Sequence, residues 1–222
     1  MGDDYIQIGD ISFLYKKGKT IFDGFSLNLP GDKISVILGD NGSGKTTLTK
    51  LIMGILKPLD GNVFIDRKNN RDLSLGEVGK SIGYLFQNPD HQIFGTSVLD
   101  QLVWSNNILG EDREYYTEKA NNLLNEFGIL DLKDRYPFYL SMGEKRMLAL
   151  ASVMMRDIRY LILDEPTSSL DSERVDILID KLKYLNGKGI GALVITHDFE
   201  FAKAIGHRIF HLEDGRIKDE TI

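Results

Sequence analysis

Short apolar runs recur along the chain and predict β-strands. Residues 33–38 are mostly apolar, and a strand buried on both faces of a parallel sheet has this composition. Further runs rich in aliphatic and aromatic residues lie at residues 5–15, 25–29, 62–66, 82–86, 160–164 and 192–196. Residues 208–212 and 216–217 flank an Asp-Gly pair, which predicts a hairpin near the C-terminus.

A helical periodicity begins at about Gly44. Apolar residues recur there at intervals of three and four positions, so they would share one face of a helix. These residues are Leu48, Leu51, Ile52 and Ile55. The chain therefore predicts a strand, a glycine-rich loop and an amphipathic helix in succession.

The pattern changes between residues 88 and 157, where helix-period segments such as 115–127 and 142–155 replace the β-branched runs. Ser141 with Glu144 three residues later predicts a capping box and a helix N-terminus. Because strands and helices alternate on both sides of this block, we expect an α/β core formed by residues 1–87 and 158–222 and interrupted by a helical insertion, residues 88–157.

Composition narrows the classes of protein that remain. The 222 residues include no cysteine, which excludes a disulfide scaffold and a thiolate zinc site. Asp and Glu number 33 against 27 Lys and Arg, and this net charge of -6 argues against a protein that mainly binds nucleic acid. No apolar run approaches the roughly 18 residues of a membrane span, and the acidic start lacks a signal peptide, so we expect a soluble, intracellular chain.

Residues 39–46 read G-D-N-G-S-G-K-T and match the phosphate-loop pattern G-x-x-x-x-G-K-[ST]. Glycines allow backbone N–H groups to surround a phosphate, and the following helix directs its positive dipole end at the charge. Lys45 would reach the β- and γ-phosphates and the Thr46 hydroxyl would bind Mg²⁺. The alternative is a glycine-rich turn without a ligand, but the position between a buried strand and an amphipathic helix favours the phosphate loop. The segment comprises Gly39, Asp40, Asn41, Gly42, Ser43, Gly44, Lys45 and Thr46.

Two further strands end in groups suited to hydrolysis. Asp164 and Glu165 follow residues 160–163, at the strand end where α/β sheets bind ligands. Asp164 would hold Mg²⁺ through water and Glu165 would act as general base, although an acidic pair at this place is also common at a helix N-terminus. His197 follows the strand at residues 192–196 and could hydrogen-bond a γ-phosphate or a water; alternatively it is structural or solvated.

His207 and His211 are four residues apart on an expected strand. This spacing corresponds to about 13 Å, too far for both to bind one zinc ion. We therefore interpret both histidines as structural.

The order of short motifs carries a resemblance over essentially the whole chain. After the phosphate loop come Gln87, L-S-M-G-E at residues 140–144, L-D-E-P at 163–166, S-L-D at 169–171 and T-H-D at 196–198. In this order the chain resembles the ATP-binding cassette (ABC) ATPase family. The resemblance implies one ABC ATPase domain over residues 1–222, with a P-loop NTPase (RecA-like) core, an antiparallel β-subdomain and an inserted α-helical subdomain. It also implies ATP and Mg²⁺ as ligands.

The resemblance assigns roles residue by residue. Tyr15 would stack on adenine and Gln87 would contact Mg²⁺ and the attacking water; otherwise Tyr15 is a strand-end aromatic and Gln87 a solvated loop amide. Glu165, His197 and Gln87 would be catalytic, and Thr46, Gln87 and Asp164 would surround the metal. Asp171 would couple two subunits. The remaining nucleotide contacts would be Thr47 with the phosphate loop and the signature residues Ser141, Gly143 and Glu144.

The family signature also implies a dimer, in which ATP lies between one chain's phosphate loop and the other chain's signature. The usual signature is L-S-G-G-Q, whereas this chain has Met142 in place of a glycine and Glu144 in place of the glutamine. A methionine there would place a bulky side chain beside the γ-phosphate in both nucleotide sites of a homodimer. We therefore favour a heterodimer with a second ABC ATPase subunit; the alternative is that Met142 points away and a homodimer functions.

The segment after Gln87 is similar to ATPases of energy-coupling-factor systems, which import vitamins, cobalt or nickel. The resemblance implies a membrane scaffold subunit, a substrate-binding membrane subunit and a peripheral position on the cytoplasmic side of the membrane. Ile93, Phe94, Val98 and Leu102 would offer an apolar patch to the scaffold, or would pack inside the helical subdomain. The alternative functions are an exporter ATPase, a non-transport ABC ATPase and a nucleotide-dependent scaffolding module.

Overall fold

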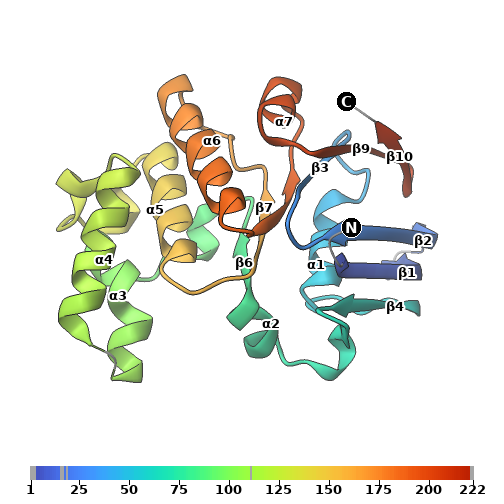
Figure 1. Cartoon of the computed structure of the whole chain (residues 1–222), viewed down its shortest axis with the longest axis horizontal. Coiled ribbons are helices and arrows are strands. Elements are labelled where there is room, and N and C mark those ends of the chain that lie inside the picture. Colours follow the sequence, from blue (N-terminus) through green and yellow to red (C-terminus); the bar gives the residue numbers. More distant parts are fainter. Residues whose placement is uncertain (1–3, 16–17, 19, 111, 221–222) are drawn as a thin grey trace.

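A computed structural model describes residues 4–15, 18, 20–110 and 112–220 (Figure 1). Six strands form one sheet in the order β10-β9-β3-β8-β7-β6, in which all neighbours are parallel except β10 and β9. The strands are β3 (Ile34–Leu38), β6 (Ile82–Leu85), β7 (Tyr160–Asp164), β8 (Gly191–Ile195), β9 (Arg208–Glu213) and β10 (Arg216–Glu220). The expected hairpin is therefore present, since β9 and β10 pair around Asp214 and Gly215.

A second, antiparallel sheet covers one side of the molecule, at the right of Figure 1. Its order is β2-β1-β4-β5, formed by β1 (Asp4–Leu14), β2 (Thr20–Pro30), β4 (Asp60–Ile65) and β5 (Lys68–Asn69). Helix α1 (Lys45–Ile52) lies between the two sheets, and its buried residues join the same apolar core as the inner face of the antiparallel sheet.

The central strands supply two cores, one on each face of the parallel sheet. In β7, Leu161 and Leu163 join the core beneath the later helices, whereas Tyr160 and Ile162 join the core that contains α1. Side chains of a strand alternate between faces, so both faces of such a strand must be apolar. This explains why residues 160–163 and 192–195 read as continuous apolar runs.

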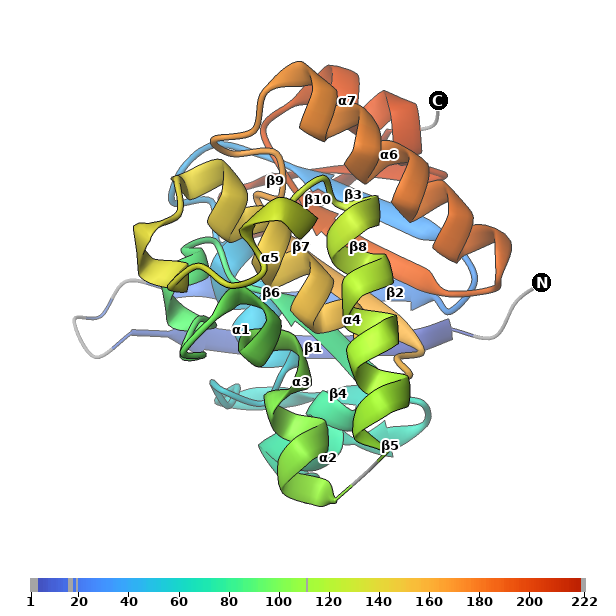
Figure 2. The same ribbon diagram turned by 90° about the vertical axis from the view of Figure 1, so that its left-hand side faces the viewer.

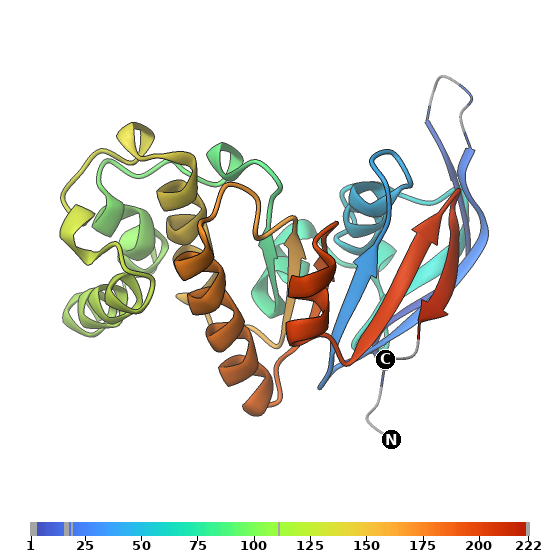
Figure 3. The same cartoon turned by 90° about the horizontal axis from the view of Figure 1, so that it is seen from above.

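Helices α3 (Val98–Leu109), α4 (Arg113–Glu126) and α5 (Met142–Met154) lie together at the end of the molecule opposite the antiparallel sheet (Figures 1 and 3). Helices α6 (Ser172–Gly187) and α7 (Phe199–Ile205) lie over the parallel sheet, and α2 (Leu75–Ser81) precedes β6 (Figures 1 and 2). Short 3₁₀ helices occur at Asn70–Asp72, Pro89–His91, Leu130–Leu132 and Pro137–Tyr139. Across the described parts of the chain, no helix combines the length and apolar character that a membrane span requires.

Most expected elements are present, but the helix after the phosphate loop is shorter than its periodicity predicts. It ends at Ile52, because Gly54 turns the chain with a φ of 73°. Ile55 therefore lies outside the helix and is 42% exposed, so its predicted place on the buried face is wrong. The capping box at Ser141 is confirmed: Ser141 Oγ accepts from the Glu144 N–H, and the Glu144 carboxylate accepts from the Ser141 N–H.

Candidate functional site

A pocket of about 380 Å³ opens at the carboxyl ends of the parallel strands. Strand ends of neighbouring parallel strands meet at one edge of a sheet, so loops that are distant in sequence converge there. Residues from the phosphate loop, from the segment after β6 and from the end of β7 line the pocket together with Tyr15 and Ile21. The lining residues are Tyr15, Ile21, Asn41, Gly42, Gly44, Lys45, Thr46, Thr47, Gln87, Asp164 and Glu165.

The phosphate loop is shaped by glycines that no other residue could replace without movement. Gly44 has a φ of 110°, and a Cβ atom there would lie 2.9 Å from Ile21 Cγ2. At Gly39 a Cβ atom would lie 2.3 Å from the Leu212 carbonyl oxygen. Both positions need a residue without a side chain. Helix α1 begins immediately afterwards at Lys45, so its free N–H groups face the pocket.

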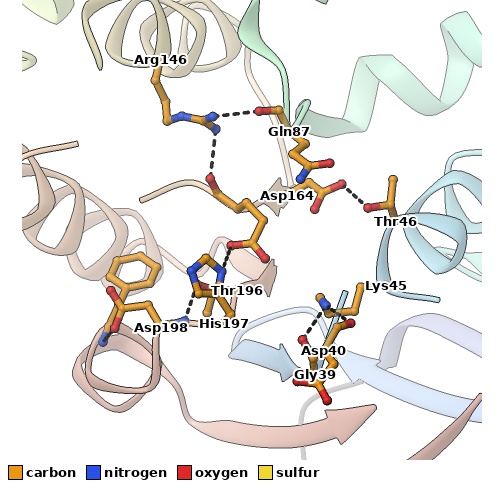
Figure 4. Close-up of polar contacts among 12 residues, drawn as sticks. Gly39, Asp40, Lys45, Thr46, Gln87, Arg146, Asp164, Thr196, His197 and Asp198 are labelled. Atoms are coloured by element: carbon orange, nitrogen blue, oxygen red, sulfur yellow. Dashed lines mark hydrogen bonds and ion pairs between the residues drawn. The ribbon is translucent and has the colours of Figure 1, made fainter. Parts of the chain in front are cut away.

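Lys45 is buried, and its ammonium contacts the main chain of the phosphate loop. Its Nζ donates to the carbonyl oxygens of Gly39, at 2.6 Å, and of Asp40, at 2.8 Å (Figure 4). Burial lowers the pKa of Lys45, and the charges of Glu165, Asp164 and Asp40 act in the opposite direction. The buried ammonium is thus held beside the pocket by two neutral carbonyl oxygens, which an anion could replace.

Asp164 is the most buried acid of the site, at 1% exposure. Its Oδ2 accepts from Thr46 Oγ1 at 3.0 Å, whereas Oδ1 is buried without a hydrogen-bond partner among the described residues (Figure 4). Burial raises the pKa of Asp164; the Thr46 hydroxyl lowers it and the Glu165 charge raises it further. A buried carboxylate oxygen without a partner, next to a hydroxyl, is the donor set that suits Mg²⁺.

Glu165 follows Asp164 but faces a different environment. Its backbone is in the left-handed region, with a φ of 51°, and its N–H donates to the Ile195 carbonyl at 2.8 Å. This conformation is costly for a residue with a side chain and is often found at functional sites. Glu165 Oε2 lies 2.9 Å from His197 Nδ1 (Figure 4), and the His197 side chain is 72% exposed. The pair therefore joins a buried carboxylate to an exposed imidazole. His197 does not line the pocket that holds Glu165; it lines a second pocket with Gly39 and Asp40.

Tyr15 and Gln87 also reach the pocket. The Tyr15 hydroxyl lies 3.1 Å from Thr47 Oγ1, and its ring packs edge-on against Phe13 while 42% of the residue stays exposed. An exposed aromatic face at the rim could stack on a planar ligand. The structure thus brings Tyr15, Gln87, Asp164 and Glu165 into one pocket with residues 41, 42 and 44–47. The predicted residues Gly39, Asp40 and Ser43 do not line this pocket.

The signature residues lie elsewhere. Ser141, Gly143 and Glu144 begin α5, and none of them lines the pocket. The Glu144 carboxylate already has hydrogen-bond partners at the helix start, since it accepts from both the N–H and the Oγ of Ser141 at 2.8 Å. Asp171 caps α6 and pairs with Arg174 at 2.6 Å. Within one chain these residues are therefore separated from the predicted catalytic groups.

Comparison with known proteins identifies the family of the chain. A family model described as ABC transporter matches residues 22–168. An ABC transporter ATP-binding protein of Pyrococcus horikoshii is 36% identical over 213 residues, which cover 96% of this chain and 82% of that protein. The chain belongs to the ABC transporter family. It is an ATP-hydrolysing subunit, with ATP as substrate and Mg²⁺ as metal cofactor.

Solved structures confirm the expected α/β fold with a P-loop NTPase core. CbiO1 from Clostridium perfringens, described as part of the ABC transporter complex cbiONQ, matches with a TM-score of 0.85 and 31% identity, over 97% of this chain and 87% of that chain. The ATP-binding cassette MJ0796, solved as a dimer bound to ADP and Pi, has a TM-score of 0.85 and 26% identity, over 96% and 98% of the two chains.

The predicted apolar patch of this ABC subunit is mostly internal. Ile93, Val98 and Leu102 are between 0% and 5% exposed and belong to the core, so their predicted exposure is wrong and the alternative of internal packing is confirmed for them. Phe94 alone of the four is exposed, at 57%. Its ring packs edge-on against Trp104, which is 45% exposed. Periodicity could not separate Phe94 from Ile93, because the loop before α3 has no regular period.

No sequence pattern indicated a role at the site for Ile21, for Arg146 or for the ion pair of Lys145 with Asp90. Ile21 lines the pocket next to Gly44 of the phosphate loop, but an aliphatic residue on a strand carries no functional signal. The Lys145 Nζ lies 2.9 Å from Asp90 Oδ1 and connects α5 to the loop after Gln87. Only the tertiary structure brings these groups together.

The two C-terminal histidines have different surroundings, and His211 lines a pocket with Gly39, Asp40 and His197. His207 Nδ1 accepts from the Ile34 N–H at 3.2 Å, which gives that residue a structural role at the start of β3. Among the described residues there is no group of three or more His, Asp and Glu side chains that could hold a metal ion.

Proposed function

We propose that this ABC subunit powers the uptake of a micronutrient, a vitamin or a transition-metal ion, in a transporter of the energy-coupling-factor type. The observation that carries the proposal is the exposed pair Phe94 and Trp104 beside a groove on the helical side of the molecule. The likeness of the segment after Gln87 to such ATPases supports it, as does the similarity to cbiO1 of the cbiONQ complex.

The groove has a volume of about 260 Å³. Its lining residues are Gln92, Phe94, Gln101, Leu102, Trp104, Ser152, Val153 and Arg156. An apolar helix of a membrane scaffold subunit could lie in it, with the two aromatic rings at its rim.

Phe94 is held in its exposed position by a buried glutamine. Gln101 is 5% exposed, and its Oε1 accepts from the N–H groups of Phe94, at 2.9 Å, and Gly95, at 2.8 Å. Its Nε2 donates to the Gln92 carbonyl at 2.9 Å. A preformed loop loses little conformational entropy on binding, so these bonds support a role in docking.

The pocket residues support the following division of roles in hydrolysis. Lys45 and the backbone N–H groups of the phosphate loop would bind the phosphates, and Tyr15 would stack on adenine. Thr46, Gln87 and Asp164 would surround Mg²⁺, which would neutralise phosphate charge when bound. Glu165 would take a proton from the attacking water while His197 orients it.

The position of the signature supports a dimer. Ser141, Gly143 and Glu144 stand at a helix N-terminus away from their own chain's pocket, so they would serve the nucleotide of a second ATPase subunit. Met142 is 42% exposed at this helix start, which favours a different ATPase subunit as the partner.

We also propose how the chain is divided into subdomains and where the subunit lies in the cell. Residues 88–157 would form a helical signature subdomain on a core of residues 1–87 and 158–222. The subunit would lie on the cytoplasmic side of the membrane, bound to a scaffold subunit and, through it, to a membrane subunit that binds the substrate.

The test uses cells that contain the native transporter. Phe94→Glu is expected to lower the amount of this subunit recovered with solubilised membranes at least about 10-fold, with ATP binding unchanged, because a charge would be buried in an apolar contact. Leu75→Glu is the control, since Leu75 is also 57% exposed but lies on α2. Equal recovery of Phe94→Glu and wild type would exclude docking at this groove.

Uptake of labelled cobalt, nickel and vitamins then tests the direction and the class of substrate. Phe94→Glu cells and Lys45→Ala cells are expected to lose uptake of the same compound. Unchanged uptake of the whole panel, with loss of an export activity, would favour the exporter alternative.

A further inference from the structure

Arg146 is a buried arginine that contacts the two predicted catalytic segments at once. It lies on α5 at 2% exposure, outside the lining of the pocket. Its Nη1 donates to the Glu165 carbonyl at 3.0 Å and its Nη2 donates to the Gln87 carbonyl at 2.8 Å (Figure 4). One planar guanidinium therefore spans main-chain atoms from two loops.

These two loops follow neighbouring strands. Gln87 lies two residues beyond the end of β6 and Glu165 directly follows β7, and the strands pair in parallel with Leu85 opposite Leu163. Beyond that last pair, no strand hydrogen bond relates the two segments. The guanidinium supplies a connection at the point where the sheet stops.

The Glu165 peptide is fixed from both sides. Its N–H donates to the Ile195 carbonyl at 2.8 Å, and its carbonyl accepts from Arg146 and, at 3.2 Å, from the Ser168 N–H. Because Glu165 has the costly left-handed φ of 51°, such contacts are needed to hold the conformation that directs its carboxylate toward His197.

A second residue of α5, Lys145, also contacts the loop that follows Gln87. Lys145 is 9% exposed and its Nζ donates to Asp90 Oδ1 at 2.9 Å. Helix α5 also carries the signature at its N-terminus, so a displacement of this helix would be transmitted to Gln87 and Glu165 together.

We propose that Arg146 is a positioning residue for ATP hydrolysis: its two hydrogen bonds set the main chain of Gln87 and Glu165 relative to each other and connect both to the signature helix. This positioning depends on the forked shape of the guanidinium, which lets two nitrogen atoms donate at once. Arginine presents several donors in one rigid plane, whereas a lysine ammonium is a point donor on a flexible stem. The inference rests on the proposed role of Glu165 as general base.

The first test compares ATP affinity and turnover in the complex isolated from membranes. Arg146→Lys keeps the charge, so we expect ATP affinity within about 3-fold of wild type and a kcat at least about 10-fold lower. Arg71→Lys is the control, because Arg71 Nη2 also donates to two carbonyl oxygens, those of Pro58 and Gly61, at 3.1 and 3.2 Å. A wild-type kcat for Arg146→Lys would overturn the proposal, as would a loss of ATP affinity equal to the loss of kcat.

The second test is a double-mutant cycle in single-turnover assays. If Arg146 acts through Glu165, then Arg146→Lys should cost less than about 3-fold in a Glu165→Gln background, because residues that act as a unit are not additive. An undiminished 10-fold loss there would show that Arg146 does not act through the Glu165 carboxylate and would overturn the proposal. A Glu165→Gln single variant with near-normal turnover would instead refute the role of Glu165, so the two failures are distinguishable.

Discussion

At the scale of single residues, the site separates two adjacent carboxylates by environment. Asp164 and Glu165 are consecutive, but Asp164 lies beside Thr46 with one oxygen unpaired, whereas Glu165 lies beside His197. The two side chains point to different partners because the backbone at Glu165 is left-handed. Two neighbouring acids can therefore serve a metal and a water molecule, respectively.

Lys45→Ala is expected to abolish ATP binding. The ammonium is the cation that closes the phosphate loop, and its present partners, the Gly39 and Asp40 carbonyls, show that it is already positioned there. Titration calorimetry with ATP and Mg²⁺ measures the effect. Undiminished binding by a folded Lys45→Ala chain would contradict the assignment of the pocket.

Glu165→Gln is expected to keep ATP binding and to lower turnover by about 10²–10⁴-fold, the usual contribution of a positioned general base. Glutamine preserves the size of the side chain and a contact with His197 but cannot accept the proton. Phosphate release at saturating ATP measures the change. Turnover within a few-fold of wild type would place the base elsewhere.

Asp164→Asn is expected to stabilise the nucleotide-free chain while weakening Mg²⁺-dependent turnover. Because burial raises the folded-state pKa of Asp164 above its ordinary 3.8, the folded state binds more protons than the unfolded state between the two values. The free energy of unfolding therefore falls as pH rises through that interval, and the penalty persists at neutral pH.

Chemical denaturation at several pH values between 4 and 8 measures this effect. The stability advantage of Asp164→Asn should be larger at pH 8 than at pH 4. An advantage that shrinks with rising pH would have the wrong sign and would show that burial of the charge is not the dominant cause.

At the scale of elements, the same capping box occurs twice with different surroundings. Ser74 with Glu77 begins α2, and Ser141 with Glu144 begins α5. Each serine Oγ accepts from the glutamate N–H three residues later, at 3.2 and 3.3 Å, so the two helix starts have nearly the same local geometry. Any functional difference between them must come from their positions in the molecule.

Ser141→Ala and Ser74→Ala form a matched pair that separates capping from function. We expect Ser141→Ala to cost about 1 kcal/mol of the free energy of unfolding, and Ser74→Ala to cost a similar amount. Only Ser141→Ala should lower ATPase turnover, because only α5 would face a partner's nucleotide. Equal turnover of the two variants would show that Ser141 is a capping residue alone.

At the scale of the whole molecule, the parallel sheet joins two cores, and no signature residue lines the pocket of its own chain. The pocket is lined by residues from the start of α1 and the end of β7. The signature begins α5, which lies on the helical side of the molecule (Figure 1). In the proposed dimer, a second subunit would supply its signature to this site.

Met142→Gly tests which subunit that is. In the isolated chain, where both sites would face Met142, we expect the glycine variant to raise turnover, because glycine allows closer approach of the backbone to the nucleotide. In the complex from membranes, one site would face the other ATPase's signature and the gain should be smaller. An isolated wild-type chain as fast as the complex, with no effect of Met142→Gly, would favour a homodimer.

Much of the fold and of the candidate site was predictable from the sequence because the signals are local. Glycines that permit unusual backbone angles specify the phosphate loop, a capping box specifies the start of α5, and apolar runs specify strands whose carboxyl ends share one edge. These features place Lys45, Thr46, Asp164 and Glu165 in one pocket without knowledge of distant contacts. Helices α2, α6 and α7 were not predicted. Helices α2 and α7 have seven residues each, too few to be stable in isolation, so they depend on the sheet. Helix α6 was missed although its buried residues Leu178 and Leu182 recur at helical spacing.

Tertiary structure decided what local patterns leave open. Ile93 and Phe94 are adjacent apolar residues, yet one fills the core and the other stays exposed, because exposure depends on which elements pack against a loop. Arg146 reaches partners 19 and 59 residues away in the chain, so no motif could reveal its two contacts. The sequence alone determined the chemistry of this ATPase, since that chemistry is carried by short segments. The connection between its signature helix and its predicted catalytic groups arises only where distant segments meet in space.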